Sequence, residues 1–88
     1  MEIRYAKAVI KTIAACDKAT KTRLREGIEG LMKKPPQGDI KPLQGYSDGR
    51  MRLRIGGYRI IFRFTQEKRI EILHIMDIGT RGDIYKRG

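Results

Sequence analysis

The sequence has few of the residues that metal sites, disulfides and large aromatic cores require. It contains no tryptophan, two phenylalanines, three prolines, one cysteine (Cys16) and one histidine (His74) among 88 residues. One cysteine and one histidine are too few for a zinc site, no acidic cluster suggests magnesium, and a lone cysteine cannot form an internal disulfide. The residues therefore predict a protein without a metal or other cofactor, in which Cys16 is a packed thiol.

Long apolar runs and acidic residues are also scarce. No stretch reaches the roughly 18 apolar residues that suggest a transmembrane helix, and the chain starts on an alternating pattern rather than a signal peptide. Twenty lysines and arginines against ten acidic residues give a net charge of +10 and a pI near 10.2. We therefore expect one cytoplasmic domain over residues 1–88 with no membrane partner. Its partner is expected to be a nucleic acid or an acidic protein.

The most informative stretch is residues 50–64, which read RMRLRIGGYRIIFRF. Two alternating runs flank Gly56-Gly57, a pair typical of two-residue hairpin turns because such turns require positive φ at their central residues. Side chains alternate across a strand, so this register gives the hairpin two unlike faces. One face carries Met51, Leu53, Ile55, Tyr58, Ile60 and Phe62, and the other carries Arg50, Arg52, Arg54, Arg59 and Arg63 around Ile61.

The five arginines predict a site for a polyanion. Arg54 is expected opposite Arg59, and Arg50 opposite Arg63, although like charges directly across two strands cost a few tenths to about 1 kcal/mol per pair. Most charge runs are only a solvated outer face. This run has no acids between its arginines, and the guanidinium group is a planar fork that matches phosphate. We therefore interpret this face as a phosphate-binding surface.

Periodicity predicts the remaining elements. The expected order is a strand over residues 1–6, a helix over 7–16, a second helix capped by Asp17 or Thr20 and ended by Pro35-Pro36, a loop over 37–49, the hairpin, and a last strand over 69–77. This order, β-α-α-β-β-β, indicates an α+β fold with two N-terminal helices packed on one face of a mainly antiparallel sheet.

The last expected strand is apolar on both faces, which is typical of a central strand covered on both sides. His74 lies within this apolar run. A ribonuclease base is one interpretation of a lone histidine in a basic protein. A packed or partly buried strand histidine is the interpretation we prefer, because its neighbours in sequence are apolar.

Four motifs together resemble one protein family. They are the strings Lys41-Pro-Leu-Gln-Gly, Arg52-Leu-Arg54, Gly57-Tyr58-Arg59-Ile-Ile and Asp77-Ile-Gly-Thr-Arg81-Gly-Asp-Ile-Tyr85-Lys86. They are similar to the RelE/ParE superfamily of toxins from bacterial and archaeal type II toxin–antitoxin pairs, and within it to the RelE branch. The resemblance covers nearly the whole chain. Its most specific parts are the R-x-R-x-G-x-Y-R hairpin and the R-G-D-x-Y tail.

The resemblance implies a function and partners. Members of the RelE branch enter the ribosomal A site and cut the mRNA there, and the 2′-hydroxyl of the RNA attacks the adjacent phosphate without a metal. The implied partners are mRNA on the ribosome and a cognate acidic antitoxin, with which the toxin forms a hetero-oligomer. No cofactor is implied.

The resemblance also implies roles for individual residues. Arg50 and Arg52 stand where the best-known RelE toxin has two lysines that activate the 2′-hydroxyl; arginine can stabilise a phosphorane dianion but is a poor base. Arg59 is expected to contact phosphate, Arg81 to lie near the leaving 5′-oxygen, and Tyr85 to stack on a base. The expected RNA-binding residues are Arg54, Arg63, Lys41 and Lys86.

Two alternatives remain open at this point. A ParE-like protein that inhibits DNA gyrase by binding shares the fold and the Tyr-Arg hairpin, so the fold does not decide between them. The Arg50 and Arg52 pair, together with Arg81 and Tyr85, favours the RelE branch. An inactive toxin that only binds its antitoxin is the other alternative, because both lysines are replaced.

Overall fold

The computed structural model describes residues 1–80 of the chain. In order, the elements are β1 (Glu2–Tyr5), α1 (Lys7–Ala14), α2 (Lys18–Leu31), β2 (Asp39–Pro42), β3 (Met51–Ile55), β4 (Tyr58–Glu67) and β5 (Ile70–Thr80). The strands form one sheet in the order β1-β5-β4-β3-β2, in which β1 is parallel to β5 and every other pair is antiparallel. The predicted α+β fold with two helices and a mainly antiparallel sheet is confirmed.

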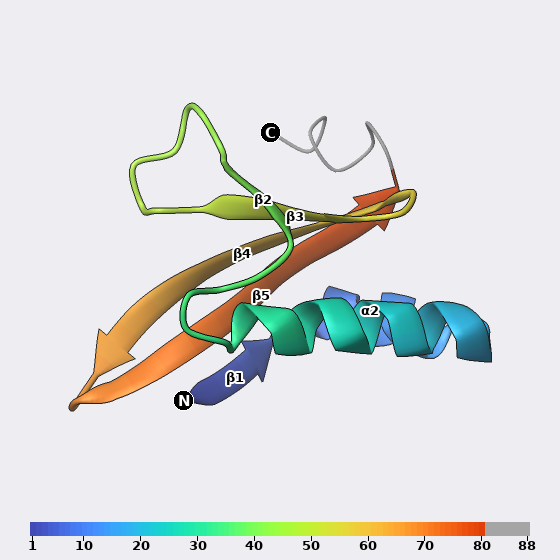
Figure 1. The fold of residues 1–88 in the computed structure, drawn as a ribbon, viewed down its shortest axis with the longest axis horizontal. Helices are drawn as coiled ribbons and strands as arrows, with labels where there is room; N and C mark the ends of the chain where they lie inside the picture. Colours follow the sequence, from blue (N-terminus) through green and yellow to red (C-terminus); the bar gives the residue numbers. More distant parts are fainter. Residues whose placement is uncertain (81–88) are drawn as a thin grey trace.

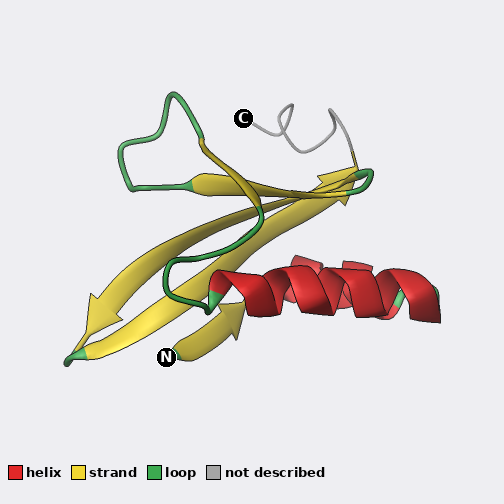
Figure 2. Ribbon diagram, in the orientation of Figure 1, coloured by secondary structure: helices red, strands yellow, loops and turns green. Residues whose placement is uncertain are grey.

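The two helices lie on one side of the sheet. In Figure 1, α2 and α1 lie below the long strands β4 and β5, while the loop between β2 and β3 rises on the opposite side. Figure 2 shows the same two layers, a helical layer and a single sheet. The other side of the sheet therefore carries no helix in the described part of the chain. Within residues 1–80, neither helix is both long and apolar enough to cross a membrane.

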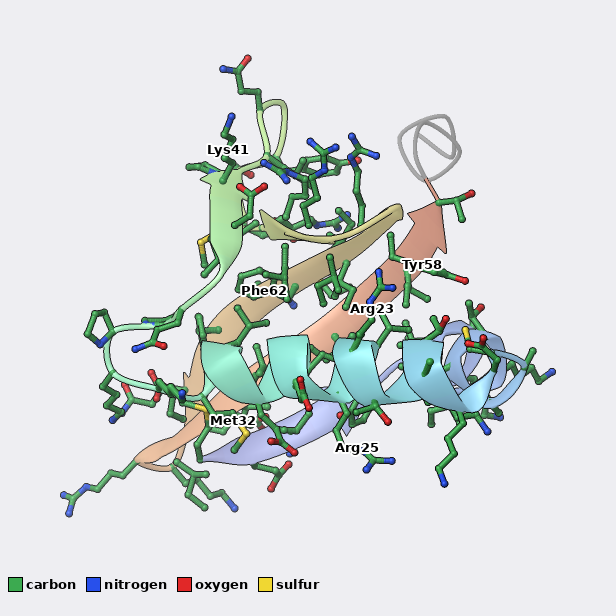
Figure 3. All side chains as sticks on the ribbon, turned by 45° about the vertical axis from the view of Figure 1, so that its right-hand side comes forward. Arg23, Arg25, Met32, Lys41, Tyr58 and Phe62 are labelled. Atoms are coloured by element: carbon green, nitrogen blue, oxygen red, sulfur yellow. The ribbon has the colours of Figure 1, made fainter. Side chains whose placement is uncertain are left out.

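The hydrophobic core lies between the helices and the sheet. Its buried members are Val9, Leu24, Ile28, Leu31, Leu53, Ile60, Phe62, Leu73, Ile75 and Ile78. Phe62 points from β4 toward α2 (Figure 3) and is 0% exposed. Fully burying a side chain of this size contributes about 1.5–3 kcal/mol relative to leaving it exposed. Cys16 packs against this core with its Sγ 3.6 Å from the Tyr58 hydroxyl, so the expected packed thiol is confirmed.

Local signals explain the position of α2. Asp17 is its N-cap and accepts a hydrogen bond from the Thr20 backbone N–H at 2.9 Å. Hydrogen bonding to the side chain of Thr20, and then to its backbone N–H, holds the pKa of Asp17 below its ordinary value. The helix ends at Leu31, before the two prolines. Gly27 faces the hairpin, and a Cβ at this position would lie 2.9 Å from Cγ1 of Ile55. The missing side chain therefore allows α2 to pack closely on β3.

The β3–β4 hairpin has the register predicted from the sequence. Ile55 lies opposite Tyr58, and Arg54 lies opposite Arg59. The turn itself differs from expectation because only Gly56 has a positive φ, of 56°. A positive φ at the first central residue alone is the pattern of a type II′ turn, whereas type I′ requires it at both. Both types match the twist of the flanking strands.

One strand was not predicted. Asp39–Pro42 forms the edge strand β2 and pairs with β3, whereas the sequence indicated a loop over 37–49. Aspartate and proline are both depleted in strands, and proline is tolerated at a sheet edge because its nitrogen needs no partner there. Ile40 packs against the core from this strand. Its tertiary contact outweighs the weak local preference.

The β4–β5 hairpin is longer than predicted. β4 continues to Glu67 and the chain turns through Lys68 and Arg69, whose φ values are +48° and +69°. Neither is a glycine or asparagine, so the sequence carries no turn signal here. The register also shifts near Ile61, so that both Ile75 and Ile78 reach the core although they are three residues apart. A bulge with one extra residue in β5 produces this change of phase.

The expectation that β5 is covered on both sides holds at Ile72, although no described helix lies on the second side. The helices cover one side, and Ile72 and His74 point to the other, because they alternate with the core residue Leu73. Ile72 is nevertheless 1% exposed. An ion pair of 3.0 Å joins Arg4 on β1 to Glu67 on β4. Since β5 lies between these strands, the pair crosses over it, and long polar side chains rather than a second layer cover Ile72.

Candidate functional site

The side of the sheet opposite the helices gathers basic side chains from all five strands. We call this surface the basic face. Its basic members are Arg4 on β1, Lys41 on β2, Arg52 and Arg54 on β3, Arg59 and Arg63 on β4, His74 on β5, and Arg50 immediately before β3. Figure 3 shows Lys41 pointing away from the helices, whereas Phe62 points toward them. The strand alternation predicted for the hairpin therefore extends across the whole sheet.

Arg54 and Arg59 form one end of the basic face, next to the hairpin turn. They are directly opposite each other in the register, and Gly79 is opposite Arg59 on the next strand. Arg54 is exposed and Arg59 is half-buried. Two guanidinium groups at one point of a solvent-facing sheet provide several N–H donors for one phosphate. This pairing is as the sequence predicted.

Arg52 does not belong to the exposed part of the face. It is 9% exposed and lies in the middle of the sheet, between Lys41 on β2 and Ile61 on β4. Its Nη2 is 3.7 Å from Oδ1 of Asp39. The expectation of five open arginines is therefore wrong at this position. The neighbouring side chains cover the long aliphatic stem of Arg52, and an acid from the strand missed by the prediction lies beside its charge.

Arg50 and Arg63 are joined by a carboxylate. Oδ2 of Asp48 accepts hydrogen bonds from Nε of Arg50 at 2.9 Å and from Nη1 of Arg63 at 3.2 Å. The hydrogen bond from Arg50, with the charges of both arginines, holds the pKa of Asp48 below its ordinary value. The sequence showed no acid within the arginine run, but Asp48 folds back from the β2–β3 loop. The expected like-charge pair is thus bridged.

The same loop adds an aromatic ring to the basic face. The guanidinium carbon of Arg50 is 4.3 Å from the centroid of the Tyr46 ring, in a cation–π contact. Tyr46 remains 45% exposed. Sequence reasoning missed both Tyr46 and Asp48, because a loop position does not reveal which strand residues its side chains reach. The available signal was their closeness in sequence to Arg50, since Tyr46 lies four residues and Asp48 two residues before it.

His74 is partly buried, as expected, but it is not part of the core. It lies opposite Arg63 on β4 and beside Arg4 on β1. Its Nε2 is 2.7 Å from Oγ1 of Thr65. The apolar neighbours in sequence suggested packing on both sides, whereas alternation with Leu73 puts the imidazole on the basic face. Histidine is a common general acid or base in enzymes, so this face holds an imidazole beside its arginines.

Three predicted site residues, Arg81, Tyr85 and Lys86, lie outside the described residues. In residues 1–80, histidine, cysteine, aspartate and glutamate nowhere gather in a group of three or more that could hold a metal ion. The described site is therefore a surface of guanidinium groups with one imidazole, one bridging carboxylate and one exposed aromatic ring. Such a surface can bind phosphate, stack on a base and exchange a proton.

Comparison with known proteins identifies the family. Residues 3–85 match the family described as ParE toxin of type II toxin-antitoxin system, parDE. The chain belongs to the RelE/ParE superfamily of type II toxins. This confirms the resemblance found in the sequence motifs. No curated protein matches the toxin in sequence.

Two solved structures resemble this toxin over most of its length. A chain of the archaeal RelE–RelB complex from Pyrococcus horikoshii OT3 is 26% identical, with a TM-score of 0.71 over 93% of the toxin and 96% of that chain. A chain of the RelB–RelE antitoxin–toxin complex from Methanococcus jannaschii is 23% identical, with a TM-score of 0.64 over 94% and 95% of the two chains. At 23% identity, the similarity to the Methanococcus jannaschii structure supports the fold alone.

Proposed function

We propose that this toxin is a ribosome-dependent mRNA endonuclease that inhibits translation and acts in the cytoplasm. The observation that carries the proposal is the basic face, where phosphate-binding arginines and a histidine share a surface that no described helix covers. An enzyme that binds a scissile phosphate needs donors aimed at the charge that develops there. The likeness to a RelE–RelB complex supports the same branch.

The roles follow from the chemistry of each group. Arg54 and Arg59 bind phosphate of the RNA, and Arg50 and Arg52 stabilise the charge that the 2′-hydroxyl attack creates at the scissile phosphate. In the tail, Arg81 neutralises the leaving 5′-oxygen and Tyr85 stacks on a base. Arginine rarely releases its proton, so it does not act as the base. No metal takes part in these steps.

We assign the proton acceptor to His74. It lies across from Arg63, which Asp48 joins to Arg50, and its Nε2 is positioned by Thr65. The charged groups that face it are Arg63 from β4 and Arg4 from β1. Glu2 and Glu67 pair with Arg4, so this cation is partly neutralised. A positioned histidine contributes on the order of 10²- to 10⁴-fold to rate as a general base.

The proposed partner outside the ribosome is an acidic antitoxin. The solved relatives are complexes of RelE with RelB, and this toxin carries a net charge of +10. A partly helical acidic segment that wraps over the basic face would neutralise the arginines and block RNA. We expect the two chains to form a hetero-oligomer.

The deciding experiment adds purified toxin to a translation extract and maps mRNA ends by primer extension. Cuts at codons in the ribosomal A site are expected, and Arg59→Ala should reduce them by on the order of 10²-fold because one phosphate donor is lost. A message with one 2′-deoxy sugar just 5′ of the cut should resist cleavage. If that message is cut at the normal rate, water is the nucleophile and the roles of Arg50, Arg52 and Arg81 are wrong.

A second candidate is inhibition of DNA gyrase. It is favoured by the family that matches the chain, which is named for the ParE toxin. A supercoiling assay with purified gyrase separates the two, because a ParE-like toxin would block supercoiling and leave mRNA intact. Absence of both mRNA cleavage and gyrase inhibition, with antitoxin binding retained, would indicate a toxin that only binds its antitoxin.

A further inference from the structure

Two arginines from different segments converge on one anionic oxygen at the edge of the basic face. Nε of Arg50 and Nη1 of Arg63 lie 2.9 and 3.2 Å from the same Oδ2 of Asp48. All three side chains are about one-third exposed, at 32, 32 and 29%. The arginines therefore already adopt the arrangement that an oxyanion requires, and solvent reaches them.

A carboxylate from the loop is an incomplete partner for this pair. Nε of Arg63 is buried and has no hydrogen-bond partner. A phosphodiester carries two non-bridging oxygens on a tetrahedral centre, so it can approach both arginines and present further acceptor positions. Guanidinium groups bind carboxylate and phosphate with the same donors. The chemistry that holds Asp48 is thus the chemistry that holds an RNA backbone.

The neighbouring aromatic ring gives this anion site the second feature of a nucleotide site. Tyr46 contacts Arg50 through its ring and stays 45% exposed. Exposed aromatic rings stack on unpaired bases with little preference for sequence. If a nucleotide's phosphate binds between Arg50 and Arg63, its base would lie close to the ring of Tyr46.

Two glycines flank the part of the loop that carries both residues. Gly45 and Gly49 flank the segment of Tyr46 and Asp48, and their φ values are +86° and +82°. A Cβ at either glycine would meet no atom within 4 Å. Glycine takes left-handed and right-handed conformations about equally well, so the two positions can serve as hinges.

We propose that Arg50, Arg63 and Tyr46 form an RNA subsite that Asp48 occupies in the free toxin, so that RNA must displace the carboxylate to bind. The subsite takes a phosphodiester with an unpaired base. This inference rests on the proposed function, since RNA is its ligand. It adds an internal competitor and a stacking residue to the proposed site.

Binding of an uncleavable probe tests the subsite. The probe is a fluorescent 2′-O-methyl RNA trinucleotide, which lacks the attacking hydroxyl, and its affinity is measured by anisotropy. Asp48→Asn should tighten binding by about two- to tenfold, because the two exposed ion pairs that compete with RNA are lost. Glu26→Gln on α2 is the matched control, since it makes the same charge change at an exposed helix position. It should tighten binding by less than twofold.

Two further variants extend the test, and one of them, Tyr46→Leu, does not depend on the folding of Asp48→Asn. Adding Arg63→Gln to Asp48→Asn should abolish the gain, and Tyr46→Leu alone should weaken RNA binding several-fold while leaving the melting temperature within a few degrees. If Asp48→Asn binds RNA no better than Glu26→Gln, Asp48 only holds the arginines in place and the inference is overturned. If Asp48→Asn binds a hexaglutamate peptide more tightly than the wild type does, but not RNA, the inference is also overturned.

The outcome is separable from that of the proposed function. Failure to cut mRNA in the extract would remove the endonuclease, whereas a gain in binding for Asp48→Asn would still support an RNA subsite. Cleavage without such a gain would keep the endonuclease and remove the subsite.

Discussion

Among single residues, His74 most clearly separates binding from chemistry. His74→Gln keeps the polar character and approximate size of the side chain but cannot accept a proton. We expect cleavage on programmed ribosomes to fall by on the order of 10²-fold or more, with RNA binding and melting temperature little changed.

Thr65→Val provides the control for this histidine. It removes the hydroxyl that lies 2.7 Å from Nε2 and keeps the shape of the side chain. We expect a smaller loss of cleavage, of about tenfold, because the imidazole remains but is less well oriented. Cleavage at the wild-type rate by His74→Gln would make the histidine a structural residue.

Asp48 links the basic face to acid stability. Its pKa is lowered from 3.8 in the folded state, so its contribution to stability is fully present above that value and is lost as pH falls through the folded pKa. Asp48→Asn should therefore unfold at lower urea concentration than the wild type near neutral pH. The two should converge as pH falls below 3.8 and through the lower folded pKa. A constant difference across this range would contradict the ion-pair origin of the shift.

Arg52 tests whether a predicted catalytic residue is also structural. It is 9% exposed, so Arg52→Ala removes a packed aliphatic stem as well as a charge. We expect a loss of about 1–2 kcal/mol in the free energy of unfolding, and a smaller loss for Arg52→Met, which keeps the stem. Urea denaturation measures both. Low cleavage by a stable Arg52→Met protein would support a role for the charge, and full cleavage would exclude it.

At the scale of elements, the sequence indicated those whose local signals agree with their contacts. The register of the β3–β4 hairpin was predicted correctly because Gly56-Gly57 separates two alternating runs. The helices follow their apolar periodicity and the Asp17 cap. β2 was missed because Asp39 and Pro42 disfavour strands and only Ile40 marks its packing. Its pairing with β3 is a long-range contact that local preferences do not report.

The turn between β4 and β5 offers a direct test of backbone strain. Lys68 and Arg69 both have positive φ, a conformation that costs residues other than glycine and asparagine roughly 1 kcal/mol each. Replacing the pair by Asn-Gly should raise the free energy of unfolding by about 1 kcal/mol, because this dipeptide prefers such turns. Urea denaturation measures the change. Replacement by Gln-Gln removes the same charges without relieving the backbone and should give no gain.

At the scale of the whole molecule, the sheet separates the hydrophobic core from the basic face. Helices and core occupy one side, and the basic face occupies the other. The arginines of the hairpin were predictable, because alternation fixes which side they share. The carboxylate of Asp48 and the position of His74 were not, since one depends on the path of a loop and the other on which side of the sheet stays open.

This separation makes a prediction about the antitoxin. If an acidic segment covers the basic face, its affinity should fall steadily as salt rises from about 0.05 to 0.5 M, because charges at the rim are screened over about 8 Å at physiological ionic strength. Titration of the toxin with its antitoxin by calorimetry measures this slope. Constant affinity across the range would indicate an apolar interface, such as one on the helical side.

The pairing of β1 with β5 has a consequence for folding of the toxin during its synthesis. Glu2 pairs with Ile72, so the first strand waits for a partner that is synthesised almost 70 residues later. β5 then inserts between β1 and β4. Pairings this distant in sequence form late in folding, and a chain emerging from the ribosome cannot form them at all until both strands are outside. The nascent toxin therefore carries its arginines without the complete sheet until synthesis has passed β5.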